Sequence, residues 1–425
     1  MPLKSLTALW VAIACSFPET NKMSLTRIST RVTSLDYMTK TLPAMGKILD
    51  LSLAEGVLQS FTGICSTYKG TSYPIPLREY FALIFDSDGI LLPDVDPVVI
   101  RKLRTLLFMF YKYEVPFTDD QVIAAHEKFI DIDDSVKTVF TSEQLDALRP
   151  MFANALDFNP MDIVGKHSSG ATSGGFDNVE RREVFQVIPS LNRVYDLKYF
   201  FNSYSHYMWH KSTKNIETVE PASRVAFVPK DSRGPRTICI EPHCRMYIQQ
   251  GVMRRIYDRL ESHVPFRGRV NFTDQTINGN LALQSSLTGE YATLDLKDAS
   301  DLVSWNLIKN VVPAEWVEPL EALRTPNAIL PDGRTVTLKK FAPMGSALCF
   351  PIEALLFFAI CRTITNDVYV YGDDIIVGKD HALACICALE SYGLAVNHTK
   401  SFIHGAFRES CGTDAFRGSV ITPIR

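Results

Sequence analysis

The 425-residue sequence lacks the features that mark several classes of protein. No apolar run is long enough to span a membrane as a helix. The nine cysteines are odd in number and include no CxxC pair, which argues against a disulfide framework and against common zinc-binding spacings. The net charge is only −3, and no repeat or low-complexity segment is present. A composition of 46% hydrophobic and 21% charged residues predicts a globular protein with two or three subdomains.

Two local patterns allow both a functional and a structural interpretation. Lys4 and the apolar stretch from Leu9 to Cys15 share features with a secretion signal, but the apolar core is short. We interpret it as a buried element or the product of an upstream start, with Met23 as an alternative start. His206 and His210 have the spacing of a metal-binding pair on a helix, but no third ligand is near in the sequence, so packing is the preferred interpretation.

The most informative stretch is VYVYGDDIIVG, residues 368–378, where two adjacent acids interrupt a β-branched run. Neighbouring side chains of a strand point to opposite faces, so a regular strand would send Asp373 or Asp374 into the core. Gly372-Asp373 instead predicts a tight turn between a VYVY strand and an IIV strand, with both carboxylates at the hairpin tip. Two such charges raise each other's pKa unless a cation compensates them. A divalent metal such as Mg²⁺ is one explanation, and a solvated turn is the other.

Other segments predict an α+β architecture around this hairpin. Residues 35–150 are typical of helices, with amphipathic stretches at 100–113 and 119–130. From about residue 285 the pattern alternates between strands and helices. The predicted elements are a strand at 291–296 with Asp295 near its end, a helix at 302–312, a strand at 335–338 and an apolar helix from Gly345 to Arg362. Asp295 and Asp373 therefore both lie at strand ends.

Between Arg224 and Arg269 the sequence contains ten basic residues and only four acidic ones. Such an excess suits a phosphate backbone or a triphosphate, although a charged run is by default a solvated face. Lys230 and Arg236, in VPKDSRGPR, are the candidates for a triphosphate. Phosphoryl transfer mainly requires two cations held about 3.5 to 4 Å apart, which carboxylates from separate strands can do.

Ten short motifs follow one another along the chain: TKTLP (39–43), SGAT (169–172), VPKDSRGPRTICIEP (228–242), DQTING (274–279), ATLDLKDASD (292–301), LPDGRTVT (330–337), APMGSALCF (342–350), YGDD (371–374), NHTKSF (397–402) and AFRESCG (406–412). In order and spacing they resemble those of the RNA-dependent RNA polymerase, or replicase subunit, of positive-strand RNA bacteriophages (leviviruses of the Qβ and MS2 type). The resemblance extends over most of the chain, and FRESCG is its most specific motif because generic turn or metal chemistry does not require it.

The resemblance implies an α+β right-hand polymerase fold of fingers, palm and thumb, with an RRM-like antiparallel palm sheet. The implied regions are an N-terminal helical region at 1–60, mainly fingers at 61–284 including the basic motif 224–242, mainly palm at 285–412, and the start of a thumb or C-terminal region at 413–425. Family members continue for roughly a hundred residues beyond this point, the size of a small domain, so the thumb is expected to be incomplete.

The resemblance also implies roles for the acids and one lysine. Asp295 and Asp373 would be ligands of two Mg²⁺ ions, with Mn²⁺ as an alternative and with Asp374 assisting. Asp301 would face the ribose hydroxyls of the incoming nucleotide. Lys400 would protonate the departing pyrophosphate, and the structural alternative for it is an ordinary exposed lysine.

The remaining implied roles concern nucleotide binding. Lys230 and Arg236 would lie over the triphosphate, and a loop of Met344, Gly345 and Ser346 would lie beneath the nascent base pair. After this loop the family has a small polar residue, a threonine and an acid, whereas this chain has Ala347, Cys349 and Pro351. Ribose selection is the property that this departure leaves open.

The function that the resemblance implies is template-directed RNA synthesis from ribonucleoside triphosphates on phage RNA, without a primer, in the cytoplasm of the bacterial host. The implied partners are RNA, nucleoside triphosphates, host elongation factors Tu and Ts and in some members a ribosomal protein, but no membrane. One alternative is a reverse transcriptase-like polymerase, which shares a Tyr-x-Asp-Asp turn; Gly372 and the acid six positions after Asp295 favour ribonucleotides. The other alternative is a non-catalytic RNA-binding replicase remnant.

Overall fold

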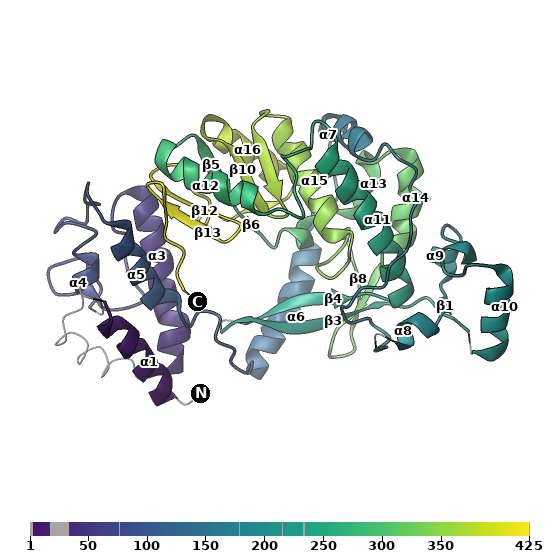
Figure 1. The fold of residues 1–425 in the computed structure, drawn as a ribbon, viewed down its shortest axis with the longest axis horizontal. Coiled ribbons are helices and arrows are strands. Elements are labelled where there is room, and N and C mark those ends of the chain that lie inside the picture. The colour runs from purple at the N-terminus through teal and green to yellow at the C-terminus, as the bar shows by residue number, and fades with distance from the viewer. Residues whose placement is uncertain are drawn as a thin grey trace.

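The computed structural model describes residues 3–17, 34–75, 77–177, 179–214, 216–232 and 234–424. Met23 and Arg233 of the basic stretch lie outside these residues. The fold is mixed α+β, as predicted, and Figure 1 shows it extended along one axis, with the N-terminal helices at one end. Within the described part, no helix is both long enough and apolar enough to cross a membrane.

The N-terminal region is built from helices joined by an irregular stretch. Its elements are α1 (Leu3–Cys15), η1 (Tyr37–Thr41), α3 (Leu42–Glu55), α4 (Arg78–Phe81) and α5 (Pro97–Phe108). Trp10 of α1 is fully buried, and its indole N–H donates to the carbonyl oxygen of Leu106 at 2.8 Å. The apolar stretch near the N-terminus is therefore a helix that is buried on the side of Trp10 and Ala14, whereas Leu9 and Cys15 are exposed. This agrees in part with the interpretation as a buried element.

Helix α5 differs in its bounds from the helix predicted over 100–113. It begins at Pro97 because the side chain of Asp96 accepts a hydrogen bond from the backbone N–H of Val98 and because proline suits the first turn of a helix. It ends at Phe108. Between α3 and α5 the chain forms turns, isolated bridges and only the four-residue helix α4, so the predicted helical character of 35–150 fails there.

A long hairpin crosses the lower middle of the molecule in Figure 1, beside helix α6 (Asp119–Ser135). It consists of β3 (Ser223–Asp231) and β4 (Gly234–Ile240), in which Val228 is opposite Arg236. Strand β7 (Asn327–Ile329) pairs in parallel with β3, and β8 (Thr335–Thr337) pairs antiparallel with β7, which gives the strand order β4-β3-β7-β8. Strand β8 agrees with the prediction for 335–338 except at its last residue.

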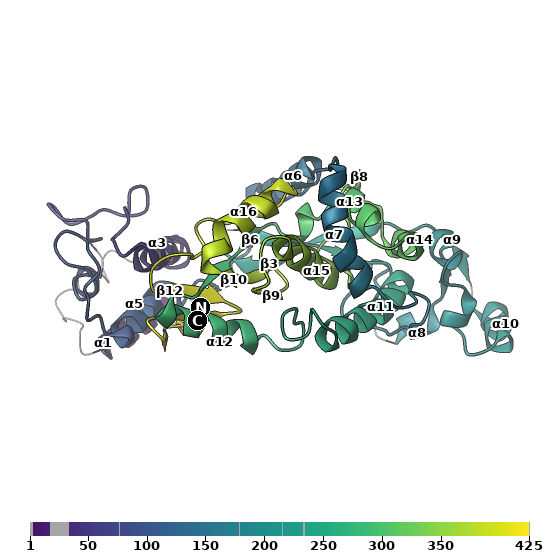
Figure 2. The same ribbon diagram turned by 90° about the horizontal axis from the view of Figure 1, so that it is seen from above.

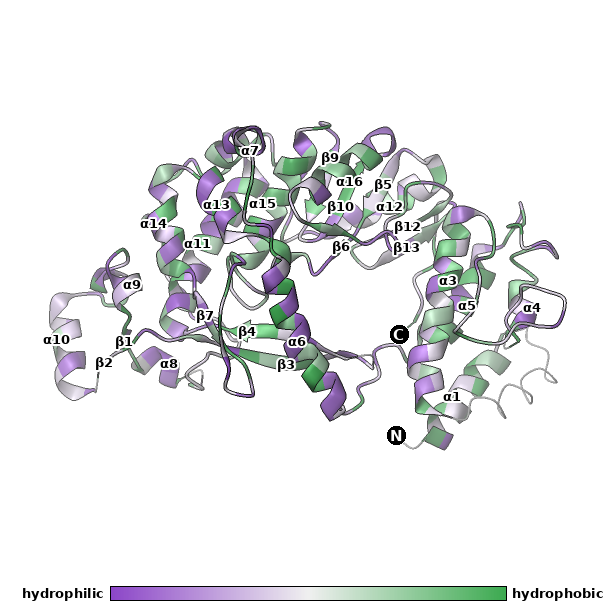
Figure 3. Cartoon of the chain, turned by 180° about the vertical axis from the view of Figure 1, so that it is seen from behind, coloured by the Kyte–Doolittle hydropathy of each residue, from purple (hydrophilic) through white to green (hydrophobic). Residues whose placement is uncertain are grey.

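Helix α6 packs against β4 of this hairpin, and helix α7 (Ser142–Ala155) follows it along the chain. Each begins with a capping box, formed by Thr118 with Gln121 in α6 and by Thr141 with Gln144 in α7. Hydrophilic and hydrophobic residues alternate along α6 in Figure 3, as expected for a helix buried on one side. Helix α6 confirms the helix predicted at 119–130 and continues for five further residues.

The second sheet positions the acid turn. It consists of β5 (Tyr291–Leu294), β9 (Val368–Tyr371) and β10 (Asp374–Gly378), all antiparallel, with β10 in the middle. A separate two-stranded pair, β6 (Leu296–Lys297) with β11 (Ala395–Val396), continues from the end of β5. The strand predicted at 291–296 is therefore interrupted at Asp295, which lies between β5 and β6.

The remaining helices include several that pack directly against this sheet, and Figure 2 shows their arrangement from above. Their bounds are α11 (His243–Ser262), α12 (Thr276–Thr288), η3 (Ser300–Leu302), α13 (Trp305–Val311), α14 (Ala314–Leu323), α15 (Cys349–Arg362), η4 (Lys379–His381) and α16 (Ala382–Ser391). Two predicted helices start later than expected. The helix predicted at 302–312 starts at Trp305 after the cap Ser304, and the helix predicted from Gly345 starts at Cys349 because Gly345 has a φ of 119°, outside the helical region.

A third sheet closes the C-terminal side of the fold. It consists of β12 (Phe407–Ser410), β13 (Thr413–Phe416) and β14 (Ser419–Val420) in sequential order. The sheet packs against α12, and β12 also contacts α3. Phe407 and Phe416 belong to the same buried apolar cluster as Trp10 and Leu106, so the two ends of the described chain share one core.

An arm projects at the end opposite the N-terminal helices in Figure 1. It contains α8 (Glu180–Glu183), β1 (Gln186–Val187), α9 (Pro189–Asn192), η2 (Leu197–Tyr199), α10 (Tyr204–Thr213) and β2 (Glu217–Thr218). His206 and His210 lie on α10, and the rings of both contact the ring of Phe201 at 5.5 and 5.4 Å. These contacts agree with the packing interpretation of the pair.

Candidate active site

Strand pairing brings the predicted acids together. Asp374 is opposite Tyr371 across the hairpin, and Ile375 is opposite Leu294 of β5. Asp295 directly follows Leu294, so it lies beside the turn that carries Asp373 and Asp374. The tight turn itself is confirmed. Gly372 has a φ of 61°, and a Cβ at this position would lie 2.0 Å from the ring of Phe350, so the turn requires glycine.

Burial and neighbouring carboxylates raise the pKa of Asp374 and of Asp295. Burial, followed by the charges of Asp373 and Asp295, raises the pKa of Asp374 to about 6. Burial also raises the pKa of Asp295, and Asp373 adds to this effect. The opposing contributions at Asp295 come from Lys400, from Asn397 and from Lys230. Such mutual repulsion is the condition that a bound cation relieves.

Two side chains of the NHTKSF motif contact Asp295 directly. The side-chain amide of Asn397 donates to Oδ2 at 2.7 Å, and the ammonium of Lys400 lies 3.7 Å from Oδ1. The backbone N–H of Asp295 donates to the hydroxyl of Ser401 at 3.1 Å. Lys400 therefore lies beside Asp295, and its side chain is 42% exposed. The structural alternative was an ordinary exposed lysine.

The donor set fits a hard divalent cation, although no complete cage is present. In the part of the chain that the structure describes, no group of three or more His, Cys, Asp or Glu side chains is already arranged around a metal position. Mg²⁺ is commonly bound by one or two carboxylates together with water and substrate phosphates, and Asp295 and Asp373 can supply two such carboxylates.

The FRESCG motif supports the acids from the neighbouring sheet. Arg408 is fully buried and donates to five carbonyl oxygens, those of Tyr291, Ile403, His404, Gly405 and Phe407. Among the charges that raise the pKa of Lys400 against the effect of burial, that of Glu409 contributes most. The hydroxyl of Ser410 donates to Oδ1 of Asp374 at 3.3 Å. The sequence identified this motif as specific but assigned no role to its residues.

Asp301 lies on η3 and is held by a lysine that the sequence analysis did not single out. The ammonium of Lys340 lies 2.9 Å from Oδ1 of Asp301. Burial raises the pKa of Glu353 on α15 well above its ordinary value, and the charges of Asp373 and Asp301 raise it further. Charges that meet only through folding leave no local pattern, and neither Lys340 nor Glu353 could be found from spacing alone.

The Met344–Ser346 loop docks on β4 and α11. The backbone N–H of Cys239 donates to the carbonyl oxygen of Met344 at 2.8 Å, and a Cβ at Gly345 would lie 2.0 Å from the Cys239 carbonyl oxygen. The side-chain oxygen of Gln249 accepts from the Ser346 hydroxyl at 3.2 Å and from the backbone N–H of Ala347 at 3.1 Å. The loop conformation therefore depends on glycine at position 345.

The predicted basic stretch divides into two groups. Lys230 and Arg236 are exposed on the β3–β4 hairpin, and Lys230 is close enough to lower the pKa of Asp295. Arginines of α11 instead make structural contacts: Arg245 is buried and paired with Glu220, and Arg254 donates to the carbonyl oxygen of Val164 at 2.6 Å. The basic residues of this stretch therefore differ in their surroundings, because Lys230 and Arg236 are exposed whereas Arg245 is buried in an ion pair.

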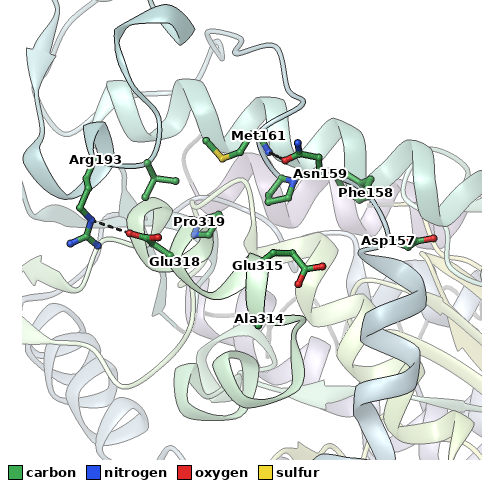
Figure 4. A pocket seen from close by; sticks show the side chains of 11 residues that line it. Asp157, Phe158, Asn159, Met161, Arg193, Ala314, Glu315, Glu318 and Pro319 are labelled. Atoms are coloured by element: carbon green, nitrogen blue, oxygen red, sulfur yellow. Dashed lines mark hydrogen bonds and ion pairs between the residues drawn. The ribbon is translucent and has the colours of Figure 1, made fainter.

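A pocket of about 680 Å³ lies between α14 and the segment 157–161 (Figure 4). Acidic side chains line it, and Arg193 pairs across it with Glu318 at 3.1 Å. None of the candidate site residues lines this pocket. It carries no indication of a ligand, so the candidate site remains the cluster around Asp295 and Asp373.

Comparisons with known proteins agree with the motifs. The family described as RNA replicase, beta-chain, matches residues 197–425. The RNA-directed RNA polymerase subunit beta of Enterobacteria phage SP is 38% identical over 216 residues, which cover 49% of this chain and 37% of that relative. The RNA-directed RNA polymerase beta chain of Escherichia phage MS2 is 37% identical over 203 residues, which cover 46% of this chain and 36% of that relative.

The corresponding subunit of Escherichia virus Qbeta is 36% identical over 216 residues and is likewise matched over only 36% of its length. The matched part of this chain thus spans little more than a third of the curated relatives. Among solved structures, the in situ structure of the BmCPV RNA-dependent RNA polymerase at elongation state covers 68% of this chain and 28% of that one, with 12% identity and a TM-score of 0.38. This TM-score is too low to support an argument about the fold.

Proposed function

Because the chain belongs to the RNA replicase beta-chain family, we propose that it performs template-directed RNA synthesis from ribonucleoside triphosphates. The observation that carries the proposal is the pairing of β5 with β10, which sets Asp295 beside the turn of Asp373. Two carboxylates from separate strands, with Lys400 and Lys230 close by, suit the transfer of a nucleotidyl group.

In this reaction the 3′-hydroxyl of the growing RNA attacks the α-phosphate, and the bond to pyrophosphate breaks. Asp295 and Asp373 would hold two Mg²⁺ ions, or two Mn²⁺ ions. Asp374, the first residue of β10, would assist them. Bound cations of this kind stabilise charge on the attacking and leaving oxygens. Lys400, 3.7 Å from Asp295, would then donate a proton to the departing pyrophosphate.

The remaining site residues would bind and orient the nucleotide. Lys230 and Arg236 are exposed on the long hairpin, where they can contact the triphosphate. Asp301 would accept hydrogen bonds from the ribose hydroxyls. Gly345 and Ser346 would form the loop beneath the nascent base pair, a role that fits their fixed docking on Cys239 and Gln249.

The family also supports proposals about the wider protein. Residues 61–284 would form mainly fingers and 285–412 mainly palm of a right-hand fold, with the RRM-like sheet formed by β5, β10 and β9; the N-terminal helices at 1–60 and the thumb start at 413–425 complete the proposed division. Initiation without a primer, action on phage RNA in the bacterial host, and assembly with elongation factors Tu and Ts and a ribosomal protein are further proposals from the family.

The test is nucleotide incorporation on an RNA template by the wild-type chain and by Asp373→Asn. We expect the variant to lose incorporation by at least about a thousandfold, as for removal of a catalytic electrostatic group, while RNA binding persists. Asp367→Asn is the matched control, since Asp367 precedes the same strand β9 at its opposite end and is largely exposed. Full activity in Asp373→Asn would overturn the assignment.

Two further results of this assay separate the alternatives. Preferential incorporation of deoxynucleotides would identify a reverse transcriptase. RNA binding with a steep salt dependence but no incorporation by the wild-type chain would identify a non-catalytic remnant.

A further inference from the structure

Lys340 is a completely buried lysine next to the candidate site. Its side chain has an exposure of 0%, and its ammonium lies 2.9 Å from Oδ1 of Asp301 and 3.8 Å from Oδ1 of Asp133. The ammonium also lies 4.1 Å from the centre of the Phe129 ring. Burying an ammonium costs free energy unless carboxylates compensate its charge. The contacts with Asp301 and Asp133 therefore hold the ammonium in this position.

Hydrogen bonds hold the backbone of Lys340 and of the residues on both sides of it. Asp133 of α6 accepts the backbone N–H of Lys339 at 2.9 Å and that of Lys340 at 3.2 Å. The backbone on either side of Lys340 is bonded to the segment that follows Asp301: Phe341 donates to the carbonyl oxygen of Val303 at 2.7 Å, and Trp305 donates to that of Lys339 at 3.0 Å. The lysine is therefore held in place independently of any ligand.

Of the three charged groups, only Asp301 reaches the surface. Its side chain is 19% exposed, whereas those of Asp133 and Lys340 are 3% and 0% exposed. Lys340 occupies Oδ1 of Asp301 and restrains rotation of the carboxylate, so the remaining acceptor positions point in a fixed direction. A carboxylate with a fixed direction can accept hydrogen bonds from a ribose hydroxyl with better geometry than a freely rotating one.

We propose that Lys340 is a positioning residue that orients Asp301 and thereby makes the chain select ribonucleotides over deoxyribonucleotides. This inference rests on the proposed function, because it gives Asp301 the task of recognising the ribose. It assigns part of the ribose selection to a lysine that precedes the Met344–Ser346 loop. Ala347, Cys349 and Pro351 replace the small polar residue, the threonine and the acid that the family has after this loop, so another residue can contribute to ribose selection here.

The test measures kcat/KM for a ribonucleotide and for the matching deoxyribonucleotide in wild type and in Lys340→Met, which keeps the apolar stem and removes the charge. We expect the ratio of the two values to fall about tenfold, the effect of one lost charge-assisted hydrogen bond. Lys339→Met is the matched control, since Lys339 is 43% exposed and pairs with Asp134 at the surface, and its ratio should equal that of the wild type.

A double variant separates positioning from mere stabilisation. If Lys340 acts through Asp301, adding Lys340→Met to Asp301→Asn changes the ratio no further, whereas thermal stability still changes. If Lys340→Met does not fold, Lys340→Gln, whose uncharged amide retains N–H donors, replaces it and should lower the ratio in the same direction.

An unchanged ratio in the folded variant, with an active wild type, would overturn this inference alone. A wild-type chain that incorporates no nucleotide would overturn the proposed function, and the inference with it.

Discussion

Replacing Arg104 with methionine should destabilise the whole chain. Arg104 of α5 is only 1% exposed, and its guanidinium makes charged contacts in two directions. It donates to both carboxylate oxygens of Asp50 on α3, at 2.7 and 3.0 Å, and to Asp414 on β13 at 2.9 Å. A fourth bond reaches the carbonyl oxygen of Ile421 at 2.8 Å. One side chain thus ties the N-terminal helices to the C-terminal sheet.

The magnitude follows from what the substitution leaves behind. Methionine keeps most of the apolar stem, so the loss of packing is small, but Asp50 and Asp414 each lose the buried guanidinium that pairs with them. Removing one partner of a buried ion pair costs about 3–5 kcal/mol, so we expect the free energy of unfolding to fall by this amount. Strand β13 pairs with β12, which carries Ser410, and nucleotide incorporation should therefore become more sensitive to temperature.

The assay is urea unfolding at 25 °C, with the free energy extrapolated to water for wild type, Arg104→Met and Arg101→Met. Arg101 is exposed on the same helix, and its substitution should change the free energy by less than about 0.5 kcal/mol. A loss below about 1 kcal/mol in Arg104→Met would refute the reasoning, because a buried ion pair that is this well bonded cannot be removed so cheaply.

Three further predictions concern the site. In Gly345→Ala the new Cβ would meet a β4 carbonyl oxygen at 2.0 Å, so nucleotide incorporation should fall at least about tenfold; Gly333→Ala, where φ is also positive but the space is open, should retain it. Ser410→Ala removes the 3.3 Å hydrogen bond to Asp374 and should slow incorporation about fivefold, from a loss of about 1 kcal/mol, without weakening RNA binding. Burial raises the pKa of Glu409 from 4.5 to about 7, so stability that is present below pH 4.5 is lost as the pH rises through 7. As the pH rises from 5 to 8, the free energy of unfolding of Glu409→Gln, measured with urea, should therefore increase relative to that of the wild type. Parallel curves of this free energy against pH for the two proteins would contradict this.

The sequence predicted those parts of the site that have a local pattern. The turn at Gly372 and the strand-end position of Asp295 follow from residues within a few positions of each other, and both are as predicted. The first residue of α15 was predicted wrongly, because Gly345 is held at a positive φ by contact with Cys239, which lies 106 positions earlier in the chain. A contact over that separation has no signature in the local pattern.

The charges beside the acids were missed for the same reason. Lys340 pairs with Asp301 across 39 positions, and Ser410 bonds to Asp374 across 36. Arg254 of the basic stretch donates to a carbonyl group 90 positions away, so the sequence showed its charge but not its structural task. Side chains whose partners come from distant elements can be interpreted only after the strands are paired.

The central claim is that Asp295 and Asp373 share bound divalent cations. Titration of the chain with Mn²⁺, followed by electron paramagnetic resonance of the free ion, tests it most directly. We expect the tightest Mn²⁺ site to weaken at least about tenfold in both Asp295→Asn and Asp373→Asn but not in Asp367→Asn, because a carboxylate ligand is lost only in the first two variants. Equal Mn²⁺ affinity in the wild type and all three variants would contradict it.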